Sequence, residues 1–387
     1  YMQLFLIHFD NFLIPPTGYQ LYNMGYTERK QLFNKIVQKR KRPLLTYITS
    51  IRPGMSSQMA GDSIRPIIDQ LELIPKNEKK VDFLIISNGG DPIASLRIMG
   101  LLRERFDTVS VLLPYVAYSA ATILSLGADE LVMHPYSNIG PVDPQLSAPH
   151  RMPSGATEQL EFSSEDIVNY IEFLRSDVKA DRDQMKTAIP PLMEQVGALN
   201  IGRSKRSQRL SFSLSEKMLG FHIDNKKKVK EIAKALNSSY YHHGYAVGRL
   251  EAKKMGLPVT FPNEELEQLL WKVWLDYEAE MRCNDAFNVV TEILADPNAS
   301  KAINSIPIIN IPANLPDAQK QIIYNNIASK INVTKQQTLS LRYMLASIES
   351  TYAAKVYYND LKLAYWRDIN LNLKFNLTSN GTGWINY

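Results

Sequence analysis

Ser119 is the residue of this chain whose type and setting best fit nucleophilic chemistry. It starts the small-residue segment Ser119-Ala120-Ala121-Thr122, which is predicted to be helical. Its Oγ would therefore lie beside free N–H groups and the positive end of a helix. A serine in this place is also a common N-cap, whose hydroxyl only closes the first turn. From Ser119 alone, both interpretations stay open.

A second segment offers hydrogen-bond donors for such a nucleophile. Residues 81–87 (VDFLIIS) are predicted to form a buried strand, and this strand runs into Asn88-Gly89-Gly90. Two glycines allow a sharp turn that leaves N–H groups pointing outward, which is what an oxyanion hole requires. Both segments follow predicted strands, and a parallel α/β sheet places its active site at the carboxyl ends of its strands.

The elements that must position these segments alternate between helix and strand, which predicts an α/β fold with a parallel sheet and right-handed crossovers. The predicted helices are 27–42, 64–73, 92–105 and 118–126, and the predicted strands are 44–51, 81–87, 109–113 and 129–133.

After about residue 150 the chain changes to long helical patterns. These cover residues 165–186, 224–236, 248–255 and 263–285, with predicted breaks at Pro190-Pro191 and over 202–213. Residues 333–365 also show a long helical pattern, inside a region rich in Asn, Ile, Ala and Tyr that begins near residue 286.

Composition limits the possible partners and compartments. The net charge of +5 over 387 residues is too small to indicate nucleic acid binding. A single cysteine, Cys283, permits no internal disulfide and fits a reducing compartment. The apolar stretch at residues 1–14 is too short to span a membrane, so we expect a cytoplasmic protein with at most peripheral membrane contact. The histidines lack metal-ligand spacing, and we expect no metal and no cofactor.

A third segment, His134 to Gln145 (HPYSNIGPVDPQ), turns these features into an ordered set. Together they resemble the serine dehydrogenase proteinases, a family of serine proteases in the Clp protease and signal peptide peptidase A superfamily, whose fold is the crotonase-like ββα superhelix. The segments that carry the resemblance are 84–90, 113–122, 128–133, 140–145 and 240–259. The resemblance covers about residues 44–260 and implies three parts: an N-terminal helical segment (1–43), the protease domain (44–260) and a mainly helical C-terminal accessory region (261–387).

The resemblance also implies roles for single residues. Ser119 falls on the family's nucleophile, and the backbone N–H groups of Gly90 and Ala120 fall on its oxyanion hole, with Gly89 in support. Asn88 stands where the family commonly has proline. Ala121 stands where glycine is usual, and its added methyl suggests a tighter pocket. Asp143 is expected to brace the loop after the strand, or else to orient the base.

The general base has several candidates. The Clp histidine falls near Val142 or Asp143 here, which favours a lysine of the kind that signal peptide peptidases keep neutral by burial. Lys179 ranks first, ahead of Lys186 and the more distant Lys205, while a structural or base role stays open for His243. Each of these lysines also fits a solvated helix face.

The resulting hypothesis is a cytoplasmic serine peptidase that assembles into a homo-oligomer and cleaves peptides or unfolded and membrane-derived protein segments. Two alternatives remain. One is a catalytically silent scaffold that only binds peptide. The other is an acyl-CoA-binding enzyme of the crotonase type, for which no glutamate near the hole is evident in the sequence.

Overall fold

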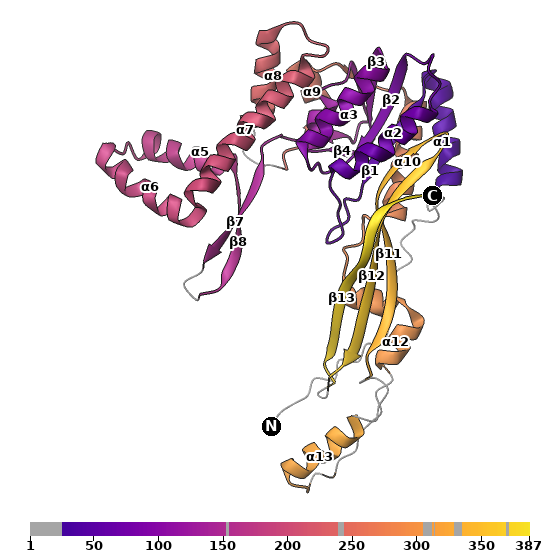
Figure 1. The fold of residues 1–387 in the computed structure, drawn as a ribbon, viewed down its shortest axis with the longest axis vertical. Coiled ribbons are helices and arrows are strands. Elements are labelled where there is room, and N and C mark those ends of the chain that lie inside the picture. Colours follow the sequence, from indigo (N-terminus) through magenta and orange to yellow (C-terminus); the bar gives the residue numbers. More distant parts are fainter. Residues whose placement is uncertain are drawn as a thin grey trace.

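The computed structural model describes residues 25–151, 155–238, 244–304, 312, 314–328, 335–368 and 371–387. Within them five parallel strands form the centre of the body, and three long strands of the same eight-stranded sheet extend from it as a ribbon, while an arm of helices extends from another side (Figure 1). The predicted α/β fold class is confirmed.

The half of the sheet that carries the site is parallel, in the order β10-β5-β3-β2-β1. Its residues are almost all buried because helices cover both faces, as is usual for parallel sheets. The strands are β1 (Leu44–Thr49), β2 (Lys80–Ile86), β3 (Thr108–Leu113), β5 (Glu130–Met133) and β10 (Val259–Thr260).

Alternate residues of each strand enter two different cores. On β1, Leu45 and Tyr47 pack against the helices that connect the parallel strands, whereas Leu44 and Ile48 pack against the first helix and a later one. The first face is covered by α2 (Ile64–Leu73), α3 (Pro92–Arg105) and α4 (Ala120–Ser125). The short turn η1 (Gly61–Ser63) precedes α2. The second face is covered by α1 (Gly25–Arg40) and α10 (Glu264–Glu280).

The arm consists of residues 145–196. It contains the hairpin of β7 (Gln145–Arg151) and β8 (Thr157–Ser163), then α5 (Ser164–Glu172), the π-helical turn η2 (Phe173–Asp177) and α6 (Arg182–Val196). Helix α7 (Ala198–Leu219) joins the arm to the body (Figure 1). Beyond it lie α8 (Lys226–Ser238) and α9 (Arg249–Met255), and a small sheet pairs β4 (Val116–Ala117), β6 (Asn138–Ile139) and β9 (Val247–Gly248).

Both predicted breaks in this region are wrong. Pro190 and Pro191 lie inside α6, where packing of Val196 in a small core with the hairpin offsets the cost of proline in a helix. Residues 202–213 lie inside α7. Its serines form part of a buried helix face, as Ser204, Ser211 and Ser215 are buried in line with Leu214 and Met218. The sequence pattern hid this face because it is built from small polar residues.

The C-terminal region combines helices and strands. The helices α10, α11 (Val289–Ala295), α12 (Pro297–Asn304) and α13 (Asp317–Ala328) agree with a helical region, but the predicted helix over 333–365 is wrong. Three antiparallel strands follow instead: β11 (Gln337–Ser350), β12 (Ala354–Arg367) and β13 (Leu373–Asn386). Alternate residues such as Leu339 and Leu341 pack against α11 and α12, which is the period of a strand.

Strand β11 continues the body sheet, because it pairs antiparallel with β1 from Leu45↔Ser350 to Thr49↔Ala346. A buried ion cluster fixes this junction. Arg29 of α1 binds Asp276 and Glu280 (2.8 Å) of α10 and Glu349 (2.7 Å) of β11, and its guanidinium lies 4.0 Å from the centre of the Tyr277 ring. The cluster thus joins the first helix, a late helix and the added strands.

We predict that Arg29→Met lowers the free energy of unfolding by about 3–5 kcal/mol, because it leaves the buried carboxylates of Asp276 and Glu349 without their partner. Chemical denaturation monitored by circular dichroism measures the change. Arg342→Ala is the matched control. It removes an ion pair with Asp360 in which both side chains are exposed, and it should leave the transition midpoint unchanged. Equal effects of the two substitutions would contradict the prediction.

Candidate active site

The turn Asn88–Gly90, called here the Gly-Gly turn, has a conformation that only glycine adopts without strain. Gly89 and Gly90 have φ values of +100° and +144°. Gly90 pairs in parallel with Met59, whose N–H donates to Gly89 O (2.7 Å) and whose carbonyl accepts from Asp91 N (2.8 Å). In such a bridge the N–H of Gly90 itself points away from Met59. It therefore remains available on the other side of the turn.

The turn at residues 118–120, called here the serine turn, holds Ser119 in a strained backbone conformation. Its φ of +50° and ψ of −116° lie outside the regions that a serine normally occupies. The side chain of Ser119 makes no capping hydrogen bond to α4. The N-cap interpretation therefore does not account for this residue, and its half-buried hydroxyl is free for another task. A strained strand-to-helix turn of this kind is the usual way to expose a nucleophilic serine.

The two turns touch each other. A Cβ placed on Gly89 would lie 2.6 Å from Tyr118 O, 2.8 Å from Ser119 Cβ and 2.9 Å from Ala120 N. No side chain fits there, so the Gly-Gly turn packs directly on the serine turn. Ala120 is the first residue of α4, so its N–H has no acceptor within the helix. The contact therefore brings Ser119 together with the backbone of Gly89–Gly90 and Ala120.

Hydrogen bonds from the surrounding core hold both turns. Ser87 Oγ accepts from Gly89 N (3.0 Å) and from Thr49 Oγ1 (2.8 Å). On the other side, Thr122 Oγ1 donates to Ala117 O (2.7 Å), and Ser95 Oγ donates to Ala120 O (2.6 Å). All these side chains are buried, so the positions of both turns are determined by the core.

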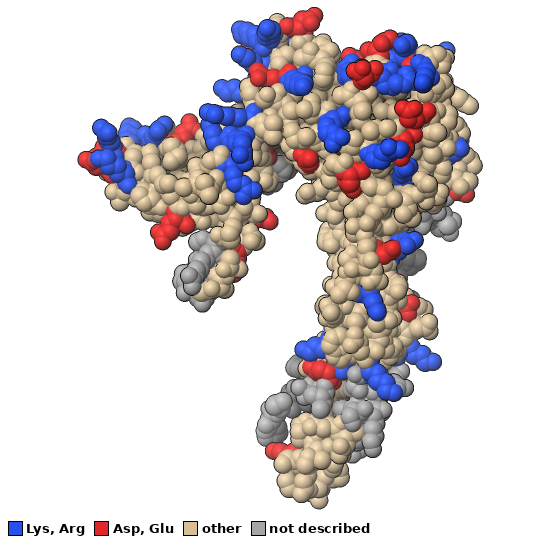
Figure 2. All heavy atoms as spheres, viewed as in Figure 1, with Lys and Arg blue, Asp and Glu red and all other residues tan. Residues whose placement is uncertain are grey.

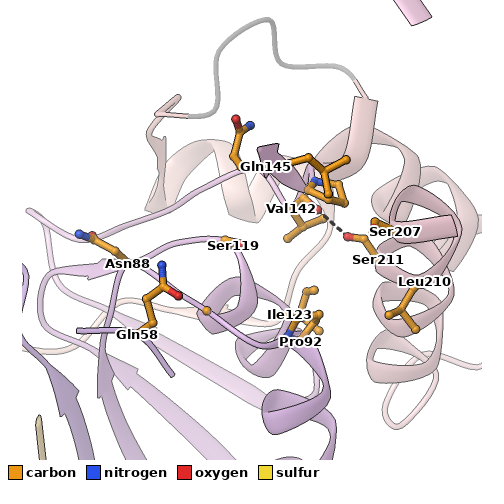
Figure 3. Close-up of a pocket in the computed structure, with 13 residues that line it drawn as sticks. Gln58, Asn88, Pro92, Ser119, Ile123, Val142, Gln145, Ser207, Leu210 and Ser211 are labelled. Atoms are coloured by element: carbon orange, nitrogen blue, oxygen red, sulfur yellow. Dashed lines mark hydrogen bonds between the residues drawn. The ribbon is translucent and has the colours of Figure 1, made fainter. Parts of the chain in front are cut away.

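A cavity of about 390 Å³ opens beside Ser119, between the residues that follow the carboxyl ends of the parallel strands and helix α7. Figure 3 shows Gln58 and Asn88 on the sheet side, and Ser207, Leu210 and Ser211 of α7 on the opposite side. The lining residues are Gln58, Asn88, Gly90, Pro92, Ser119, Ile123, Val142, Pro144, Gln145, Leu146, Ser207, Leu210 and Ser211. Ala121 is not among them. It is fully buried in the core, so its methyl does not narrow the pocket as expected.

The structure does not bring the predicted base to Ser119. Lys179 is exposed in the turn between η2 and α6, on the arm, and Lys186 pairs with Asp183 (2.7 Å) at the surface. Lys205 is exposed on α7, where it bonds Gln208 (3.1 Å). None of the described cavity-lining residues is lysine or histidine. Exposure is the physical reason against these lysines, because a lysine serves as a base only where burial or neighbours keep it neutral.

The histidines outside the cavity have other environments. His134 is buried and stacks on Trp271, with ring centroids 5.2 Å apart, and burial lowers its pKa. His222 bonds Leu126 O (2.9 Å). His243 lies outside the described residues, as does the adjacent part of the family-like segment.

Asp143 lies in the loop that borders the cavity. It is buried, and it accepts a hydrogen bond from Gln145 Nε2 (2.9 Å). The charge of Asp143 acts on Glu165 of α5. Burial raises the pKa of Glu165, the hydrogen bond from Gln208 lowers it, and the negative charge of Asp143 raises it further. This placement fits the predicted bracing role of Asp143.

The sequence does not predict the cavity wall formed by α7, because its pattern indicates a break in this segment and only Lys205 within it is a candidate, a distant one, for the base. Ser211 Oγ donates to Val142 O, which ties the helix to the loop that borders the cavity (Figure 3). In composition these serines resemble a flexible linker. The one signal that could have indicated a helix is the i, i+7 spacing of Ser204 and Ser211, which places both on one buried face.

Comparison with known proteins agrees with this geometry. Residues 2–169 match the family model described as ClpP-like SDH-type serine proteinase. The matched segment contains the Gly-Gly turn, the serine turn and the loop at Asp143. The resemblance to the serine dehydrogenase proteinases is confirmed over this segment.

Two curated relatives are uncharacterized proteins of Methanocaldococcus jannaschii. The first is 27% identical to this chain over 53% of this chain and 62% of its own length. The second is 25% identical over 50% of this chain and 56% of its own length. The chain thus spans about three fifths of the length of these relatives.

Solved structures with a similar arrangement include a mutant of the 1510-N membrane-bound stomatin-specific protease. It is 15% identical, with a TM-score of 0.33 over 58% of this chain and 83% of that one. ClpP1 from Listeria monocytogenes is 14% identical, with a TM-score of 0.31 over 61% of this chain and 99% of that one.

We predict that Gly89→Ala destabilises the protein by about 2 kcal/mol or more, because the methyl meets the serine turn at less than contact distance and φ is +100°. Thermal unfolding measures the change. Gly100→Ala, in the middle of α3, is the control. Its methyl would meet no atom within 4 Å, and it should be neutral or stabilising. An unchanged melting temperature in Gly89→Ala would show that the two turns are not packed as described.

Proposed function

We propose that this protein is a serine peptidase with Ser119 as its nucleophile and the N–H groups of Gly90 and Ala120 as its oxyanion hole. The observation that carries the proposal is the strained conformation of Ser119, packed against a Gly-Gly turn beside a cavity. The combination of a φ of +50° with a ψ of −116° is outside the usual regions for serine, and strained residues of this kind cluster at functional sites, where the surrounding structure holds them. The family match over residues 2–169 supports peptide bonds as the target.

In this mechanism Ser119 Oγ attacks the carbonyl carbon of the scissile peptide bond while a base removes its proton. The negative charge that develops on the carbonyl oxygen is held by the two backbone N–H groups. Collapse of the tetrahedral intermediate expels the amine, which takes up the proton, and leaves an ester on Ser119. Water then attacks this ester by the same route and frees the enzyme.

The exposure of Lys179, Lys186 and Lys205 argues against these three residues as partners of Ser119, so the identity of the base is left to experiment. Assembly into a homo-oligomer stays a prediction from the sequence. No helix of the described residues is long and apolar enough to cross a membrane. Membrane-derived segments as substrates, peripheral membrane contact and a cytoplasmic location likewise remain expectations from the sequence.

A fluorophosphonate probe tests the nucleophile, since it labels an activated serine hydroxyl. We expect stoichiometric labelling of the wild type and none in Ser119→Ala, measured by intact mass. Ser207→Ala is the matched control, because Ser207 lines the same cavity without a strained backbone, and this variant should keep full labelling. An unlabelled but folded wild type would contradict the proposal.

The lysines are tested by their alanine variants in the same assay. Because Lys179, Lys186 and Lys205 are exposed, we expect each alanine variant to retain the labelling rate of the wild type within a factor of two or so. A loss of 10²-fold or more in one of them would assign that lysine as the base.

A catalytically silent peptide-binding scaffold is the second candidate. It is favoured by the absence of lysine and histidine among the described residues that line the cavity. Peptide binding to the wild type without labelling or cleavage would select this function over the first.

A further inference from the structure

Positive charge is concentrated on the helices beside the cavity. Residues 198–238, which span α7 and α8, contain ten Lys and Arg against three Asp and Glu, an excess larger than the net charge of +5 of the whole chain. Figure 2 shows these side chains gathered where α7 and α8 lie in Figure 1. The rest of the protein is therefore close to neutral, and the basic region is local.

Two of these basic residues lie on the same face of α7 as the residues that line the cavity. Arg203 precedes Ser207 by four positions and Leu210 by seven, and Arg206 precedes Leu210 by four. Residues at these spacings share one helix face. Arg209 lies two positions from Ser207 and from Ser211 but only three positions after Arg206, so it lies at the border of this face.

Both guanidinium groups are available to a ligand. Arg203 and Arg206 are exposed, and within the described residues neither takes part in an ion pair; Arg203 makes a single long hydrogen bond (3.4 Å) to Asn200. Of the acidic residues nearby, Glu165 accepts a hydrogen bond from Gln208 (2.8 Å) on another side of α7, whereas Asp143 lies in the loop that borders the cavity and accepts one from Gln145. The two guanidinium groups beside the cavity-lining face of α7 thus have no ion partner among the described residues, and together they outweigh the single charge of Asp143.

We infer that this site selects polypeptide segments with acidic side chains a few residues from the bond placed at Ser119, and that Arg203 and Arg206 are the specificity-determining residues. This inference rests on the proposed function. The described residues that line the cavity include no Lys, Arg or His that could bind a carboxylate. The lining combines neutral polar residues with apolar side chains such as Ile123 and Leu210. A chain bound across the cavity would place an uncharged residue there and its neighbouring carboxylates on the two arginines, which bind carboxylates in bidentate fashion.

Binding of two fluorescent peptides to the Ser119→Ala variant tests this inference, because that variant cannot cleave them. One peptide carries glutamates on both sides of a central leucine, and the other has glutamine in their place. We expect the acidic peptide to bind about fivefold more tightly by fluorescence anisotropy at low salt, as two exposed charge pairs allow, and the difference to shrink as salt is added.

Further variants in the Ser119→Ala background assign the effect to the two arginines. Adding Arg203→Ala and Arg206→Ala should abolish the preference for the acidic peptide. Adding Lys226→Ala and Lys230→Ala instead removes the same charge from exposed positions of α8, which contributes none of the described cavity-lining residues, and the preference should persist. Circular dichroism confirms that each variant is folded.

Three results would overturn the inference: equal affinity for both peptides, equal effects of the two double substitutions, or arginine-dependent binding only to vesicles that contain phosphatidylserine. Labelling by the fluorophosphonate probe separates this failure from failure of the proposed function. A labelled Ser119 with no charge preference rejects only the specificity, whereas an arginine-dependent preference in a protein that is never labelled rejects only the catalysis.

Discussion

The packing of Gly89 against residues 118–120 is the contact on which the site depends. A strained Ser119 persists only if its surroundings allow no relaxed alternative, and here the Gly-Gly turn lies too close for any side chain to intervene. Buried hydroxyls of Ser87, Ser95 and Thr122 hold the backbone on both sides. Both turns are held by the core, so in the proposed mechanism the backbone donors would need no reorganisation when charge develops.

The cavity beside this rigid centre depends on a helix that comes from a distant part of the chain. Helix α7 links the arm to the body, packs on α4 and α8, and forms one wall of the cavity; Ser215 accepts a hydrogen bond from Asn237 of α8. Hydroxyls that bond backbone carbonyls, as Ser211 bonds Val142, satisfy polar groups in a dry interface. The same helix carries Arg203 and Arg206 next to its lining residues Ser207 and Leu210, so in the proposed function one element would contribute to both the shape and the charge of the approach to Ser119.

The C-terminal strands extend the parallel sheet without touching the site. Strand β11 pairs with the free edge of β1, and the buried cluster around Arg29 joins it to α1 and α10. Covering an edge strand in this way removes a row of unpaired backbone groups. Helix α10 covers the second face of the sheet, opposite the helices that carry Ser119, while the added strands contribute to both cores, with Ile348 in the first and Val356 in the second.

The sequence by itself determined the alternating α/β order, the strand ends at which Asn88–Gly90 and Ser119 lie, and the resemblance to a protease family that a match over residues 2–169 supports, because buried strands and Gly-Gly turns leave local and ordered patterns. The tertiary structure alone decided three things. It made strands of residues 337–367 because the edge of β1 was available, and it continued α7 through a stretch that reads as a linker. It also left Lys179 exposed on the arm, because the nearness of a side chain to Ser119 depends on how distant elements pack, which spacing along the chain does not encode.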